Sequence, residues 1–350
     1  MTDVTIVIPT YNESENIPEL VQRIHASCNG VRILVVDDSP NLLTQQVAEK
    51  WGCKVYHRYS KKGLSSAIID GIEQADTSKV IVMDADLQHP PEVLPQMIDA
   101  LDDYGLVIGS RWVKGGGVKD WSFKRVLVSK VANALAFLVA PRIKDRTSGF
   151  FGVRKECVDT SKLSSVGWKT ALEIMAKGNY KSAKEVPFIF VPRTKGDSKF
   201  NVKQIREYLK QLIPLYFTCP IVKFATVGAS GAILSLLTMY LFVDVAHIYY
   251  LLAYALSFIL VVSSNFIWHS LWTFRQKAKV INWFKYACIS AIALGINEGL
   301  LYLLTGKLGL HYLLSTIIGM FTAFLINWTL SRRIVWKKQT QFQPKIAMWQ

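Results

Sequence analysis

Two aspartates one residue apart, Asp84 and Asp86, are the side chains of this sequence best placed to do chemistry. They follow a short apolar run, Val80–Met83, which is typical of a buried strand in a parallel sheet. Ligands of open α/β sheets bind just beyond the carboxyl ends of such strands. Two carboxylates at this spacing can reach one Mg²⁺ or Mn²⁺ ion, which usually takes one or two protein carboxylates together with water and substrate phosphate. The alternative is a pair of solvated acids in a loop, because short motifs often match by chance.

The elements around the two acids favour a site. Segments with helical character separate the apolar runs, and alternating strands and helices predict a parallel α/β sheet that is covered on both faces. Polar residues at four strand ends then converge on one crevice, which separate solvated loops would not do. The other three runs are Val4–Pro9 before Thr10–Glu13, Ile33–Val36 before Asp37–Pro40, and Leu106–Ile108 before Gly109–Arg111, and the helical segments lie near Ile17–Ile24, Leu42–Lys50, Ser65–Gln74 and Glu92–Leu101.

The composition of the 350 residues divides in two. Residues 1–205 are mixed and charged, which predicts the α/β domain, whereas 221–333 are overwhelmingly apolar. A span needs about 20 apolar residues to cross a hydrocarbon core of ~30 Å. A soluble bundle would need polar faces at helical spacing, and these are missing. We therefore expect an all-α membrane domain of four spans, near Ile221–Val243, Ile248–Phe274, Phe284–Leu304 and Tyr312–Ser331, followed by a basic tail at 334–350.

The charges beside the spans predict an orientation, because Lys and Arg in short loops mark the cytosolic side. Basic residues lie between the second and third spans and after the fourth, whereas the other two connections hold Asp244, His247 and Lys307. Met1–Asp3 leads straight into the first apolar run, which argues against a cleaved signal peptide. We expect both termini and the α/β domain to be cytosolic. The basic residues are Arg275, Lys277 and Lys279, then Arg332, Arg333, Lys337 and Lys338.

Net charge and cysteines exclude other classes of protein. The charge of +15 suits anionic lipid headgroups, and no zinc spacing, RNA-binding aromatic pattern or basic helix indicates nucleic acid. The five cysteines are scattered without a paired motif, so we interpret them as reduced and structural.

The segment 203–219 links the two domains. Its apolar residues at 205, 208, 209, 212 and 213 have helical spacing, with cationic residues opposite. This pattern predicts an amphipathic helix in the membrane interface. A helix packed on the α/β domain is the alternative.

Seven pieces of the first 200 residues, in order, carry a resemblance to a known family. Through them the N-terminal half resembles the family-two glycosyltransferases of the GT-A fold, specifically the dolichyl-phosphate mannose synthase group. The membrane half is similar to GtrA-like four-span domains, mainly in hydropathy. The pieces are Ile8–Glu13, Val35–Asp38, Lys62–Ala67, Met83–Pro91, Gly109–Arg111, Ser148–Phe151 and Gly196–Lys199.

The resemblance implies sites for the nucleotide-sugar donor and a divalent metal ion, Mg²⁺ or Mn²⁺. The family usually has Asp-Asp-x-Ser-x-Asp after the second strand, but Asp37–Asn41 is one residue shorter and its last acid is replaced by Asn41, which leaves the nucleotide open. The metal and pyrophosphate would contact Asp84, Asp86 and Gln88. The donor would contact Pro9, Tyr11, Glu13, Val36, Asp38, Asp84, Ala85, Arg193 and Lys199.

The resemblance also implies a lipid acceptor, a polyprenyl (dolichyl) phosphate. Its phosphate would contact Arg111, Arg125 and Ser129, and the expected catalytic residues are Asp86, Arg111 and Arg125. Arg125 lies in a helical segment where a solvated surface role is the alternative, and Arg193 and Lys199 lie in a charged loop that could be merely exposed. Gln88 could instead cap the next helix, and we expect His89 to shape the turn.

The implied reaction is metal-dependent, inverting transfer of a hexose, expected to be mannose from GDP-mannose. A phosphate monoester is already anionic near neutral pH, since its second pKa is about 6, so a general base is not obligatory and Glu13 is assigned to donor binding. Transfer of glucose from UDP-glucose is one alternative, and a non-catalytic carrier of lipid-linked sugars is another. The set of Asp84, Asp86 and Arg111 argues against the carrier. A processive synthase is disfavoured because no Gln-x-x-Arg-Trp motif is found.

Overall fold

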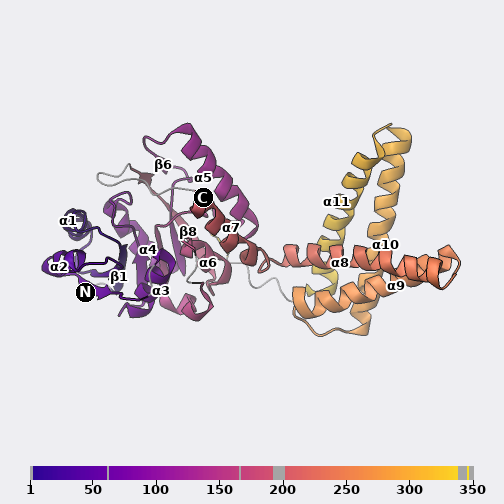
Figure 1. Ribbon diagram of the computed structural model, residues 1–350, viewed down its shortest axis with the longest axis horizontal. Coiled ribbons are helices and arrows are strands. Elements are labelled where there is room, and N and C mark those ends of the chain that lie inside the picture. Colours follow the sequence, from indigo (N-terminus) through magenta and orange to yellow (C-terminus); the bar gives the residue numbers. More distant parts are fainter. Residues whose placement is uncertain (1–2, 61–62, 165–166, 192–201, 338–344, 347–350) are drawn as a thin grey trace. The chain divides into compact units, whose positions relative to one another are not determined.

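The computed structural model describes residues 3–60, 63–164, 167–191, 202–337 and 345–346. The chain divides into two compact units, which are coloured along the sequence in Figure 1. The first, the α/β unit, is Met1–Thr218 with Gln343–Gln350, and the second, the membrane unit, is Cys219–Phe342.

An eight-stranded sheet forms the centre of the α/β unit. The prediction of a parallel sheet is wrong at one strand: β7 (Phe151–Arg154) runs antiparallel between β4 (Lys79–Val82) and β5 (Leu106–Ser110). The chain enters β7 directly from a loop at the carboxyl edge of the sheet, so this strand must run the opposite way. The order is β10-β8-β5-β7-β4-β1-β2-β3, with β1 at Val4–Thr10, β2 at Arg32–Asp37, β3 at Lys54–His57, β8 at Ser182–Pro187 and β10 at Lys345–Ile346. A separate pair joins β6 (Gly117–Val118) to β9 (Ile189–Phe190).

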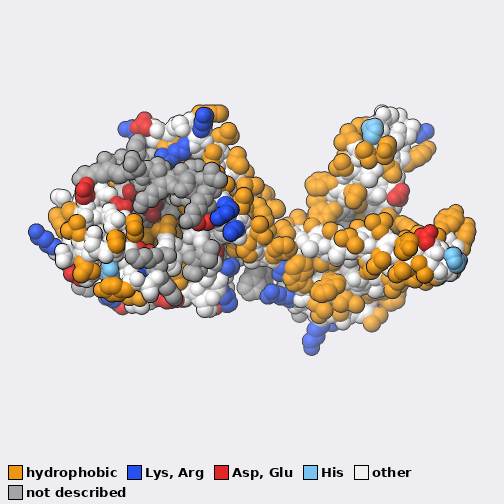
Figure 2. All heavy atoms as spheres, viewed as in Figure 1, with side chains coloured by type: hydrophobic (Ala, Val, Ile, Leu, Met, Phe, Trp, Pro, Cys, Tyr) orange, Lys and Arg blue, Asp and Glu red, His pale blue; other side chains and the backbone are white. Residues whose placement is uncertain are grey.

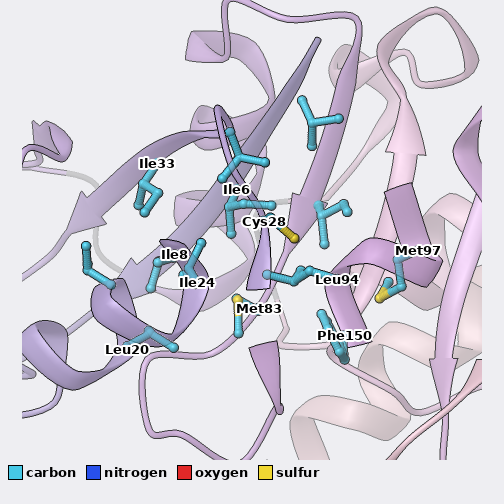
Figure 3. Packing of buried hydrophobic residues seen from close by; sticks show 14 of the residues in the cluster. Ile6, Ile8, Leu20, Ile24, Cys28, Ile33, Met83, Leu94, Met97 and Phe150 are labelled. Atoms are coloured by element: carbon cyan, nitrogen blue, oxygen red, sulfur yellow. The ribbon is translucent and has the colours of Figure 1, made fainter. Parts of the chain in front are cut away.

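Helices pack on this sheet through apolar faces. In α1 (Ile17–Ser27) the buried residues Ile17, Leu20, Val21 and Ile24 recur at helical spacing. Figure 3 shows Leu20 and Ile24 in one cluster with Ile6 and Ile8 of β1. The cluster continues to Met83 and Phe150, so the packed core ends directly beneath Asp84. The other helices are α2 (Leu43–Lys50), α3 (Leu64–Gln74), α4 (Leu94–Asp103), α5 (Phe123–Leu135), α6 (Thr170–Lys177) and α7 (Val202–Tyr216).

Four long helices make up the described part of the membrane unit. Each helix continues into a π-helical turn. With this turn included, the four helices are 26, 24, 28 and 24 residues long, and their mean hydropathies are 1.7 to 1.9. The four spans predicted from the sequence thus correspond to helices that are long and apolar enough to cross a membrane. They are α8 (Pro220–Tyr240), α9 (Tyr250–Trp268), α10 (Val280–Leu301) and α11 (Tyr312–Leu330).

The two hairpins of the membrane unit repeat each other. The bounds of α9 and of its π-helical turn recur 62 residues later in α11, at 250 and 312, 268 and 330, and 273 and 335. The three residues that α10 buries, Tyr286, Ile289 and Ala293, each lie 62 residues after a buried residue of α8, namely Phe224, Val227 and Gly231; α8 also buries Lys223 and Thr238. The unit is therefore built from two equivalent helical hairpins.

Candidate active site

The polar strand ends meet at one edge of the sheet, as the sequence predicts. Thr10 at the end of β1 is paired with Asp37 at the end of β2, and the Thr10 hydroxyl donates to the Asp37 carboxylate at 2.9 Å. On the other side of β1, the Met83 N–H donates to the Val7 carbonyl, which places Asp84 at the same edge. The parallel registers of these strands bring the polar residues together.

A tight turn displays the acidic pair. The Asp86 carboxylate accepts from the backbone N–H of Gln88 at 3.2 Å, and Leu87 between them has a φ of 62°. Asp86 is 5% exposed, whereas the side chain of Asp84 is 39% exposed. The Gln88 amide nitrogen donates to the Val191 carbonyl at 3.1 Å. The amide oxygen is the atom of this side chain with lone pairs that suit a cation.

His89 holds the turn in place, as predicted. Its Nδ1 accepts the backbone N–H of Asp84 at 3.0 Å, and its ring stacks on Phe150 with centroids 5.0 Å apart. Burial lowers the pKa of His89 to about 4, so the ring is neutral at pH 7. The Asp84 carboxylate oxygen 3.7 Å from Nδ1 is therefore not an ion-pair partner, because Nδ1 carries no proton.

The donor atoms fit a divalent cation. Two carboxylates and an amide oxygen are hard ligands of the kind that Mg²⁺ and Mn²⁺ prefer. Among the described residues, no group of three or more His, Cys, Asp or Glu side chains could hold a metal ion. Asp84, Asp86 and Gln88 would instead offer two carboxylates and an amide oxygen, a set that water and phosphate could complete.

Arg111 follows β5 and is gripped by a residue that the sequence analysis missed. Its Nε and Nη2 each donate to a different oxygen of Asp145 at 2.7 Å, and its backbone N–H donates to the same carboxylate at 2.9 Å. Nη2 also donates to the Thr147 hydroxyl at 3.0 Å. Asp145 is fully buried and Arg111 is 8% exposed. The two-pronged face of the guanidinium is thus directed at Asp145, and within the described residues only Nη1 is left to meet a substrate.

Arg125 approaches the same aromatic rings as Arg111, although it comes from the exposed helix α5. Its guanidinium lies 4.2 Å from the centroid of Trp121 and 5.9 Å from that of Phe190, and Arg111 lies 5.6 and 5.7 Å from the same two rings. Ser129 lies one turn further along α5. The structure therefore brings Arg111 and Arg125 to the same two rings and shows Ser129 on the same helix as Arg125, while Arg193 and Lys199 lie outside the described residues.

A network between β2 and α3 surrounds Asp38. Its carboxylate accepts two bonds from Arg58, at 2.8 and 2.5 Å, and one from the Gly63 N–H at 2.8 Å. Arg58 also donates to Ser66 and Asp70 of α3. No motif in the sequence marks Arg58. Arg58 and Gly63 connect Asp38 to the first turn of α3, which begins within the Lys62–Ala67 piece.

The remaining predicted donor residues line the start of this edge. Pro9 is paired with Val36 inside the sheet, and Tyr11 is 47% exposed just beyond it. The Glu13 carboxylate accepts from the Asn16 amide at 2.7 Å, at the start of α1. Asn41, which replaces an acid of the family pattern, is exposed and accepts the Leu43 N–H at 3.1 Å. Asn41 thus lies in the turn that precedes α2.

Lys169, just before α6, was also missed by the sequence analysis. Its ammonium donates to the Thr147 carbonyl at 2.5 Å and lies 4.3 Å from the centroid of Trp168. Burial, and then the charge of Arg111, lower the pKa of Lys169 to about 8, while the charge of Asp84 opposes the shift. An isolated lysine in an irregular segment carries no motif, so no local signal indicates this position.

Known proteins resemble both units of the chain. Residues 5–161 match the model of glycosyl transferase family 2, and residues 223–336 match that of the GtrA/DPMS transmembrane domain. A dolichol-phosphate mannosyltransferase of Pyrococcus furiosus is 38% identical over 95% of this chain and 99% of its own. A polyprenol monophosphomannose synthase of Mycolicibacterium smegmatis is 38% identical over 58% of this chain and 82% of its own. A solved structure of glucosyl-3-phosphoglycerate synthase from Mycobacterium tuberculosis has a TM-score of 0.44 and 15% identity over 62% of this chain and 79% of that one.

Proposed function

Because the chain belongs to the dolichol-phosphate mannosyltransferase family, we propose that it transfers mannose from GDP-mannose to a polyprenyl phosphate, with inversion at the anomeric carbon. It is a glycosyltransferase and an integral membrane protein. The observation that carries the proposal is a similarity that extends over both units, 95% of the chain. The basic residues beside the second and fourth spans support an orientation with both termini and the α/β unit on the cytosolic side.

The reaction joins two phosphate-bearing substrates. An anionic oxygen of the acceptor phosphate attacks the anomeric carbon, while the bond from that carbon to the diphosphate breaks and the diphosphate leaves with the electron pair. No proton has to move, because the acceptor oxygen is already ionised near neutral pH. Glu13, whose carboxylate accepts from Asn16, therefore stays a residue of the donor site and not a base.

The acidic turn and the arginines would bind different groups in the reaction. Asp84, Asp86 and Gln88 would hold Mg²⁺ or Mn²⁺, which when bound neutralises charge on the leaving diphosphate as a Lewis acid. Arg111, through Nη1, and Arg125 with Ser129 would receive the acceptor phosphate. Positioning of two mutually repelling phosphates can account for much of the lowering of the barrier.

The base and ribose would lie at the β1 and β2 ends. Tyr11 offers an exposed ring there, and the backbones of Pro9, Val36 and Ala85 border the same edge. Asp38 would act on the donor through Arg58 and Gly63, since its carboxylate already accepts bonds from both. Arg193 and Lys199 remain proposed donor contacts.

An exposed apolar face on two helices supports a lipid acceptor. α7 buries Tyr208, Gln211, Leu212 and Leu215 but leaves its opposite side exposed, and α5 buries no residue. The Tyr208 hydroxyl donates to the Ala132 carbonyl of α5 at 2.8 Å, so the two helices lie side by side. Figure 2 shows hydrophobic side chains gathered along α5. The exposed apolar residues include Phe123, Leu127, Val131 and Leu135 of α5, and Ile205, Leu209 and Ile213 of α7.

We infer that this face lies in the membrane interface beside Arg125. The segment 203–219 would then be both a helix packed on the α/β unit and an amphipathic helix in the membrane interface. One side of α7 packs on the α/β unit, and the other side meets lipid. A phosphate at headgroup depth would be within reach of α5.

A radiolabel transfer assay tests the proposal. Full-length protein in vesicles that contain a polyprenyl phosphate is given labelled GDP-mannose, UDP-glucose or GDP-glucose. We expect an organic-soluble product from GDP-mannose alone. A product from UDP-glucose instead would replace this proposal with the glucosyltransferase.

A further inference from the structure

We propose that Lys169 takes part in the transfer by donating hydrogen bonds from its ammonium to a phosphate oxygen at the reacting centre. The inference rests on the proposed function, since that reaction supplies the phosphate. None of the seven family-like pieces contains this residue.

The location of the ammonium is the first argument. Nζ donates to the Thr147 carbonyl, and Nη2 of Arg111 donates to the hydroxyl of the same threonine. The charges of Asp84 and Asp145 both act on Lys169. The amine therefore lies among the predicted metal and acceptor residues and not on an outer face.

Unsatisfied donors are the second argument. An ammonium carries three N–H donors. Within the described residues, the structure gives Lys169 one hydrogen-bond acceptor, the Thr147 carbonyl. Lys169 is only partly buried, so its other two N–H groups can reach a substrate. Phosphate oxygens would supply the missing acceptors and the opposite charge.

The third argument is that two helices, α7 and α3, fix the backbone that carries Lys169. Gln211 of α7 accepts the Lys169 N–H and donates to the Lys169 carbonyl, each at 3.3 Å. From α3, Ser65 donates to the Gly167 carbonyl at 2.8 Å and bonds the Thr170 hydroxyl at 3.1 Å. Such support is expected of a side chain that must be held in place for a reaction.

The close approach of Gln211 also constrains the residue type at position 167. Gly167 has a φ of +100°, which disfavours other residues. A Cβ there would lie 2.6 Å from Oε1 of Gln211. Gln211 lies on the buried side of α7, whose other side we place in the membrane interface, so the helix that meets lipid also holds the backbone of Lys169.

In the transfer, Lys169 stays protonated throughout. The bond from the anomeric carbon to the diphosphate oxygen breaks as the bond to the acceptor oxygen forms, and the ammonium stabilises the negative charge on a phosphate oxygen. Removing one such donor from a reacting centre typically costs about 100-fold or more in kcat.

Three full-length variants test the role: Lys169→Gln, Lys169→Arg and, as a matched control, Lys155→Gln. Lys155 also donates from its ammonium to backbone carbonyls, those of Glu73 and Ala75, but away from the sheet edge that carries the site. We expect Lys169→Gln to lower kcat by about 100-fold, Lys169→Arg to recover part of the loss, and Lys155→Gln to transfer at the normal rate. The proposal is overturned if Lys169→Gln has a normal kcat. It is also overturned if Lys155→Gln loses as much kcat and Tm as Lys169→Gln does.

Labelling of the unmodified protein provides a test that does not depend on how the variants fold. Lysines are amidinated with and without ligand, and modification of Lys169 and Lys155 is followed by peptide mass spectrometry. GDP with Mg²⁺, or a short-chain polyprenyl phosphate, should slow labelling of Lys169 but not of Lys155, and the effective ligand tells whether the donor or the acceptor phosphate is bound. Protection by neither contradicts the proposal. If the unmodified protein transfers no mannose but GDP still protects Lys169, the proposed function fails while the phosphate contact stands.

Discussion

Buried polar groups serve different purposes in the two units. In the described part of the α/β unit, two buried ion pairs lie near one sheet edge, Arg58 with Asp38 and Arg111 with Asp145. The described part of the membrane unit shows no buried ion pair, and several of its buried polar atoms, among them Oδ1 of Asn265 and Nε2 of His269, have no hydrogen-bond partner. This contrast supports our proposal that the α/β unit carries the chemistry and the membrane unit provides placement.

Polar residues inside the spans join helices to one another. Thr238 and Ser257 share a hydrogen bond of 2.6 Å between α8 and α9, and Asn327 of α11 bonds Ser290 of α10 at 3.4 Å. Asn327 therefore links α10 and α11. The α8–α9 hairpin also brings Gly231 against Asn265, because small residues allow such close approach between membrane helices.

The largest expected effect comes from the acidic turn. Asp86→Ala should lower transfer by about 1,000-fold or more, because it removes a proposed ligand from the charge-neutralising centre. Excess chelator should abolish transfer by the unmodified protein, and Mg²⁺ or Mn²⁺ should restore it. Asp102→Ala is the control, since Asp102 is an exposed acid paired with Lys79. Full activity in Asp86→Ala, or in excess chelator, would remove the metal from the mechanism.

Separating the units tests the comparison most directly. A fragment ending at Thr218 keeps α7, whose Leu212 and Leu215 are buried, with the α/β unit. We expect it to bind GDP normally by calorimetry but to transfer mannose to long-chain polyprenyl phosphate in vesicles ~100-fold more slowly, because membrane anchoring raises the effective acceptor concentration. A short soluble polyprenyl phosphate should remain a good acceptor. A well-folded fragment that binds no GDP would show that the membrane unit completes the site.

The sequence predicts best what is local along the chain. Strands and spans follow from hydrophobic runs, and Asp84, Asp86 and Gln88 belong to one contiguous turn. The sequence did not predict the roles of Asp145, Arg58 and Lys169. Their hydrogen-bond partners lie 34, 20 and 22 residues away, so only the folded chain brings them together. The antiparallel β7 was missed for a similar reason: an apolar run gives no direction, and its direction depends on where the preceding loop ends.

A smaller effect is expected at Arg125, whose guanidinium lies over Trp121. Arg125→Lys keeps the charge but loses the planar group that packs on the ring, a contact worth about 0.5–2 kcal/mol. Transfer should fall about tenfold, with GDP binding unchanged. Lys124→Gln, next to it on the exposed helix, is the control. If Arg125→Lys and Arg125→Ala both transfer at the normal rate, the acceptor phosphate does not bind at α5.

The smallest effect on the chemistry is expected from a change inside the membrane unit. A Cβ at Gly231 would lie 2.6 Å from the amide atoms of Asn265, so Gly231→Leu requires the Asn265 side chain or the two helices to shift. Overpacking of this kind costs about 1–3 kcal/mol, and the membrane unit should unfold at a lower temperature. Gly228→Leu, one turn earlier on the same helix, is the matched control, because a Cβ there meets nothing within 4 Å. Donor binding, measured by calorimetry, should stay within about twofold in both variants, because the substitutions lie in the membrane unit and we place the donor site in the α/β unit. A tenfold change in affinity would correspond to ~1.4 kcal/mol. If Gly231→Leu stays folded but loses GDP binding, the two units share the donor site and the division of labour between them is wrong.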